Sequence, residues 1–107
     1  MDLADEVYRL TRSFPKEEMF GLTSQMRRAA VSIPSNIAEG QGQLTDKGFM
    51  LFLTRARGSL YELETQTELA SRLGFLKKQD EEEILASCSE IGRMLHGLLK
   101  SIREEKQ

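Results

Sequence analysis

The sequence predicts an all-α protein folded as an antiparallel, up-down four-helix bundle. Apolar residues recur every three or four positions along nearly the whole chain of 107 residues, and this is the helical period. The chain has only two prolines, and the β-branched and aromatic residues that favour strands are sparse. Because 39% of the residues are hydrophobic and 30% are charged, the composition is globular, and we expect one domain over residues 1–107.

Four amphipathic segments joined by short connections account for the chain. We expect helices at about residues 2–13, 22–40, 45–73 and 80–103. The first ends before Pro15, because a proline disfavours the helical conformation of the residue that precedes it. Pro34 lies inside the second helix, where it removes one backbone hydrogen bond and predicts a kink. Thr45 is a good N-cap for the third helix and Gly74 a good C-cap.

Residues that usually carry catalytic or metal chemistry are few. The one histidine, His96, follows Arg93 by three positions, so the Glu-x-x-His motif of di-iron bundles is missing. The one cysteine, Cys88, lies on the apolar stripe of the fourth helix and predicts a small buried side chain rather than a nucleophile. We therefore expect a protein without enzymatic activity, cofactor or metal, and a ligand- or metal-binding bundle is the weakest alternative.

The start of the sequence, its longest uncharged stretch and its cysteine content predict the cellular location of the protein. The chain begins with an acidic segment, whereas a secretory signal begins with basic residues and continues with apolar ones. Its longest uncharged stretch, residues 29–38, is well below the ~18 residues of a membrane helix. A single cysteine fits a reducing compartment. We expect a cytoplasmic protein with no membrane partner.

The net charge of −2 hides a gradient along the chain. Residues 1–8 carry −3, residues 9–57 carry +4 and residues 58–107 carry −3. The pI is about 5.5, whereas a dedicated nucleic-acid module usually has a pI above ~9. RNA or DNA would therefore bind a local basic patch, if these charges are more than ordinary solvated side chains. The candidates for that patch are Arg12, Lys16, Arg27, Arg28, Arg55 and Arg57.

The second helix contains an unusually polar segment around its proline. Asn36 and Glu39 are three positions apart and so share a helix face. One interpretation is a solvated face. The other is a polar contact surface that meets Arg57, Ser59 and Glu62 of the third helix, within one chain or across two.

Several runs are more distinctive than a helical pattern: residues 8–18, 21–40, 52–63 and 91–99. They closely resemble the bacterial four-helix-bundle proteins encoded in intervening sequences of 23S ribosomal RNA genes. This family is related to the accessory variability determinant of diversity-generating retroelements. The family signature falls on Pro34, Asn36, Glu39, Gly40, Arg57, Gly58, Ser59 and Glu62. In mid-helix, Gly58 costs about 1 kcal/mol relative to alanine, which predicts that another helix approaches closely there.

The resemblance implies a helical protomer that assembles into a ring-like homopentamer without known enzymatic activity. The retroelement branch binds nucleic acid through a basic surface, whereas this chain is slightly acidic. We expect a non-enzymatic, oligomeric interaction or scaffold protein with weak nucleic-acid binding. The alternative is a dedicated RNA- or DNA-binding accessory factor. The expected partners are further copies of the chain, then RNA or DNA, and a separate protein is a further candidate.

Overall fold

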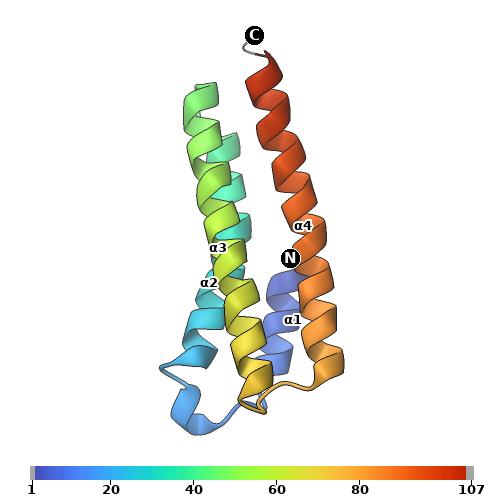
Figure 1. Ribbon diagram of the computed structural model, residues 1–107. Coiled ribbons are helices and arrows are strands. Elements are labelled where there is room, and N and C mark those ends of the chain that lie inside the picture. Colours follow the sequence, from blue (N-terminus) through green and yellow to red (C-terminus); the bar gives the residue numbers. More distant parts are fainter. Residues whose placement is uncertain (1, 106–107) are drawn as a thin grey trace.

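The computed structural model describes residues 2–105, and this part of the chain is all-helical. Four α-helices are joined by short connections, one of which contains the 3-10 helix η1, Lys16–Glu18. The α-helices are α1 (Asp2–Thr11), α2 (Leu22–Gln41), α3 (Asp46–Arg72) and α4 (Lys78–Glu105). They alternate in direction (Figure 1). The predicted fold class is confirmed, and every helix end lies within two residues of its expected position.

The four helices cover one another unequally. The most extensive contact joins α2 to α3, which run side by side in Figure 1. Helix α1 has only 10 residues and spans about 15 Å, whereas α4 has 28 residues and spans about 42 Å. Consequently α1 lies beside only the half of α4 that is lower in Figure 1. Beyond the start of α1, the bundle consists of three helices.

The core contains side chains from all four helices. Its largest fully buried members include Val7, Met26, Ile33, Leu53, Leu60, Leu63, Ile84 and Leu95. Cys88 is fully buried among them, as its place on the apolar stripe predicted. None of the helices within residues 2–105 has the length and apolar character that a bilayer span requires.

The predicted caps are present. The Thr45 side chain accepts a hydrogen bond from the Gly48 backbone N–H at 3.0 Å, which caps α3. At the other end of α3, Gly74 has φ +82°, and the next residue, Phe75, donates its N–H to the Ala70 carbonyl at 3.0 Å. Helix α2 continues through Pro34 to Gln41.

Two signature glycines have different surroundings. Gly40 is buried where α2 meets α3, and a Cβ added there would lie 3.0 Å from Phe49 Cδ1 and 3.2 Å from Phe52 Cβ. A side chain at this position would therefore push the two helices apart. By contrast, nothing in residues 2–105 lies within 4 Å of a Cβ added at Gly58. The expected close approach at Gly58 is thus wrong within one protomer.

Candidate functional site

The polar segment of α2 is hydrogen-bonded to α3 within one protomer. Asn36 Nδ2 donates to the Ser32 carbonyl at 2.8 Å and to Ser32 Oγ at 2.9 Å. Ser59 of α3 is 2.9 Å from the same hydroxyl and donates to it. These three residues form a chain of hydrogen bonds across the α2–α3 contact.

Ser32 and Ser59 also line a cleft of about 400 Å³ between α2 and α3, which we name the polar cleft. Its other lining residues are Phe20, Ser24, Gln25, Arg28, Ala29 and Glu62. Arg28 and Glu62 carry opposite charges, but no ion pair joins them. The two ion pairs within residues 2–105 lie elsewhere, in α4.

The adjacent arginines of α2 have different surroundings. Arg27 Nε donates to Thr11 Oγ1 at 2.9 Å, and the Arg27 guanidinium lies 4.7 Å from the centre of the Tyr8 ring. These contacts join α2 to α1, so Arg27 is engaged within the protomer. Arg28 instead lines the polar cleft, with its side chain exposed.

The other basic candidates are spread along the bundle. Arg12 and Lys16 are exposed in the connection from α1 to α2, which forms the lowest part of the bundle in Figure 1. Arg55 is exposed on α3, 5.0 Å from the centre of the Phe52 ring, and Arg57 is half-buried on the same helix. The six basic residues therefore do not form one compact patch.

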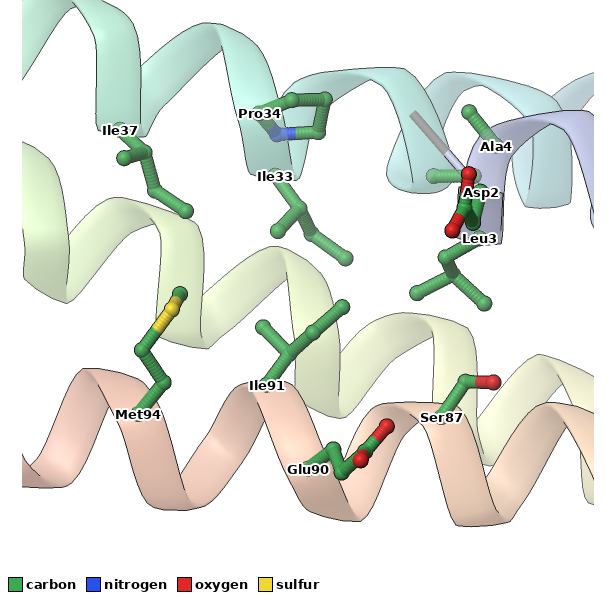
Figure 2. A pocket seen from close by; sticks show the side chains of 11 residues that line it. Asp2, Leu3, Ala4, Ile33, Pro34, Ile37, Ser87, Glu90, Ile91 and Met94 are labelled. Atoms are coloured by element: carbon green, nitrogen blue, oxygen red, sulfur yellow. The ribbon is translucent and has the colours of Figure 1, made fainter.

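A second concave surface lies between α2 and α4, at the point where α1 begins. This apolar groove has a volume of about 520 Å³. Figure 2 shows Ile33 and Ile37 of α2 pointing toward Ile91 and Met94 of α4, with Leu3 of α1 at one end of the groove. Met94 is 48% exposed, so the groove is open to solvent. Its lining also includes two acids, Asp2 and Glu90 (Figure 2).

Comparison with known proteins identifies the family. The family model for the 23S rRNA-intervening sequence protein matches residues 1–97. The chain belongs to this family. Among solved structures, its fold is similar to that of a protein of unknown function from the S23 ribosomal protein family of Bacteroides thetaiotaomicron, with a TM-score of 0.83. The two chains are 24% identical over 92% of this chain and 93% of that one. No curated protein matches.

Three of the signature residues line the two concave surfaces. Ser59 and Glu62 line the polar cleft, and Asn36 is bonded to one of its serines. Pro34 lines the apolar groove. Glu39 is exposed near the end of α2, and no ion pair joins it to Arg57 in the described part of the chain.

An acidic contact joins α1 to α4 beside the apolar groove. Glu6 of α1 lies next to Glu83 and Ser87 of α4, and its Oε1 is buried without a hydrogen-bond partner in residues 2–105. Burial, and then the neighbouring Glu83 carboxyl, raise the pKa of Glu6 to about 7. Arg9 and the Ser87 hydroxyl partly oppose this rise.

The remaining reactive residues, Cys88 and His96, both line an open hollow of about 510 Å³ between α3 and α4. Burial raises the pKa of the Cys88 thiol to about 12, and the nearby Glu64 and Glu6 act in the same direction. His96 is exposed on α4. Within residues 2–105 there is no group of three histidine, cysteine or acidic side chains placed to hold a metal ion. The polar cleft and the apolar groove, which contain signature residues, are the candidate binding surfaces.

Phe20 is the most exposed of the cleft residues that the sequence did not indicate. It lies in the connection between η1 and α2, outside every apolar stripe, and its ring is 96% exposed. The only sequence signal was a large aromatic residue directly before Gly21 in a connection too short to bury it.

Proposed function

We propose that the protein is a non-enzymatic cytoplasmic scaffold that associates with further copies of itself through the apolar groove. The observation that carries this proposal is the short α1, which fills only part of the space between α2 and α4. Isoleucine and methionine side chains that α1 would otherwise cover therefore line an open surface. An exposed apolar surface of this kind is a candidate contact surface for another protein.

Charge favours a second copy of the chain as the occupant. Helices α1 and α4 together contain ten acidic and five basic residues, whereas α2 and α3 contain five acidic and six basic ones. The acidic lining of the groove, Asp2 and Glu90, is therefore repelled less by α2 and α3 of another copy than by its α1 and α4. Because the two surfaces differ, the contact is heterologous, and such contacts form a ring when the rotation between neighbouring copies closes and an open filament when it does not. The family resemblance implies a ring of five.

The test is the mass of the assembly in solution, measured by light scattering after gel filtration. We expect a multiple of the 12.2 kDa protomer mass, five for the ring that the family implies. Met94→Glu places a charge in the groove and should dissociate the assembly. Met19→Glu is the matched control, because Met19 is also 48% exposed but lies in the connection after η1.

Two outcomes would contradict the proposal. A wild-type protein of 12.2 kDa at all concentrations would exclude self-association. An assembly that survives Met94→Glu as well as it survives Met19→Glu would show that the groove is not the contact surface.

Nucleic-acid binding is a second candidate function, favoured by basic residues without ionic partners. Neither ion pair in residues 2–105 involves an arginine of α2 or α3, and both Arg28 and Arg55 are exposed. Such cations bind phosphates by releasing counterions. This supports either weak binding by the scaffold or, as the alternative, a dedicated RNA- or DNA-binding accessory factor.

The second candidate is tested by fluorescence anisotropy with short labelled RNA and DNA over a series of salt concentrations. We expect the logarithm of the association constant to fall linearly with log salt, with a slope of about −0.7 per phosphate contact for single strands. The double variant Arg28→Gln, Arg55→Gln should flatten the slope, whereas Arg93→Gln, Arg103→Gln on α4 should not. Absence of binding at low salt would exclude this function and leave the scaffold proposal standing.

A further inference from the structure

The polar cleft contains hydrogen-bonding groups that the protein does not use. Ser32 Oγ is within bonding distance of both the Asn36 amide and the Ser59 hydroxyl. Whichever of the two hydroxyls donates to the other, one hydroxyl proton is left without an acceptor in residues 2–105. The Glu62 carboxylate and the Arg28 guanidinium also lack ionic partners within the described residues. The cleft therefore offers an acceptor pair, a hydroxyl donor and a cation to a ligand.

An aromatic ring lies at the same cleft. Phe20 lines it and is 96% exposed, although a phenylalanine side chain is normally covered. The ring of an exposed phenylalanine is a surface on which another flat ring can stack. With a volume of about 400 Å³, the cleft lies in the range of ordinary small-molecule sites.

The charges in the cleft identify which flat ring fits best. A bare phosphate or other small anion is disfavoured, because Glu62 would repel it. The two oxygens of a carboxylate accept most strongly from two adjacent N–H donors. Guanine presents this pair on its pairing edge, whereas adenine and cytosine each present a single amino group. Uracil presents one N–H between two carbonyls, and a carboxylate repels the carbonyls.

We propose that the polar cleft binds an unpaired guanine nucleotide, with the base stacked on Phe20 and its N1–H and amino group donating to Glu62. The unused hydroxyl proton at Ser32 and Ser59 is the donor for the guanine carbonyl, and Arg28 is the cation for its phosphate. When the guanine belongs to RNA or DNA, the proposal rests on the nucleic-acid candidate above. A free guanine mononucleotide has the same chemistry.

The experiment compares labelled oligouridines that carry one central guanine, inosine or adenine, together with the plain oligouridine, at one low salt concentration. We expect the guanine strand to bind about tenfold more tightly than the plain strand, since a good bidentate contact to one base discriminates by about 1–3 kcal/mol. Inosine lacks the amino group and should lose most of this preference. Phe20→Ala should reduce affinity for the guanine strand about tenfold. Glu62→Gln should remove the preference for guanine, whereas Glu68→Gln, the matched control on α3, should retain it.

The outcomes separate this proposal from the function on which it rests. Equal affinity for all four strands would overturn guanine recognition while leaving nucleic-acid binding intact. Binding of guanosine monophosphate alone, with no affinity for any strand, would assign the cleft to a free nucleotide. No binding of either probe would overturn both the second candidate function and the guanine site. A changed oligomeric state in Phe20→Ala, with the guanine preference unaltered, would place Phe20 at a subunit contact and overturn its stacking role.

Discussion

Replacing Glu6 with glutamine tests the effect of the acid pair between α1 and α4 on stability. The pKa of Glu6 is raised from 4.5 to about 7, so between these pH values the folded protein binds a proton that the unfolded chain releases. The stability associated with this group is complete below about pH 4.5 and is lost as the pH rises through about 7. Without solvent screening, the difference between these two pKa values corresponds to about 3 kcal/mol in the free energy of unfolding. Because the Glu6 side chain is only half-buried, solvent screening reduces our expectation to about 1 kcal/mol.

The assay is urea unfolding, followed by circular dichroism at a fixed protein concentration, at about pH 4.5 and about pH 8. From the lower to the higher pH, the free energy of unfolding of Glu6→Gln minus that of the wild type should rise by about 1 kcal/mol. In thermal unfolding, the same change corresponds to about 4 to 8 °C in Tm. Asp5→Asn is the control, because Asp5 is an exposed acid on the same helix. A difference that stays constant with pH, or that Asp5→Asn reproduces, would refute the argument that burial and the neighbouring Glu83 raise the pKa of Glu6.

Three further predictions concern packing, capping and reactivity. Gly40→Ala should lower the free energy of unfolding by about 1 kcal/mol, because the new Cβ would lie 3.0 Å from the Phe49 ring. Gly97→Ala, which has open space, should raise it by up to about 1 kcal/mol, and equal changes in the two urea midpoints would contradict the packing argument. Thr45→Ala removes the N-cap of α3 and should cost about 1 kcal/mol, whereas an unchanged midpoint would show that the cap is dispensable. The Cys88 thiol should resist a disulfide reagent at neutral pH until guanidinium unfolds the chain, and reaction of the native protein at the rate of a free thiol would contradict its burial.

The helices were predictable because local signals determine them. The apolar spacing, the Thr45 cap and the left-handed Gly74 place the ends of α3 within one residue, and all of these signals act over a few positions. The length of α1 could be predicted in the same way. The open groove that results from this length could not be predicted, because it depends on which half of α4 the short helix covers.

The candidate sites were less predictable because each depends on which neighbour a side chain meets. The sequence indicates that Arg27 and Arg28 diverge on the helix surface, but only the packing of α1 engages Arg27 with Thr11. The polar segment was expected to meet Ser59, and the structure connects the two through Ser32. The apolar spacing does not assign Phe20 to any helix. Its exposure follows from the path of the chain between η1 and α2.

The unequal contacts of the helices also set an order of events in folding. Helices α2 and α3 are consecutive in sequence and make the most extensive contact, so a hairpin of the two forms with little loss of loop entropy. Of the four α-helices, α1 is stabilised least by packing, because it is short and packs along only half of the bundle. In native-state hydrogen exchange, the amides of α1 should therefore open at a lower free energy than those in the middle of α3. A protease that acts on transiently opened chain would then cut at α1 while the α2–α3 hairpin remained intact.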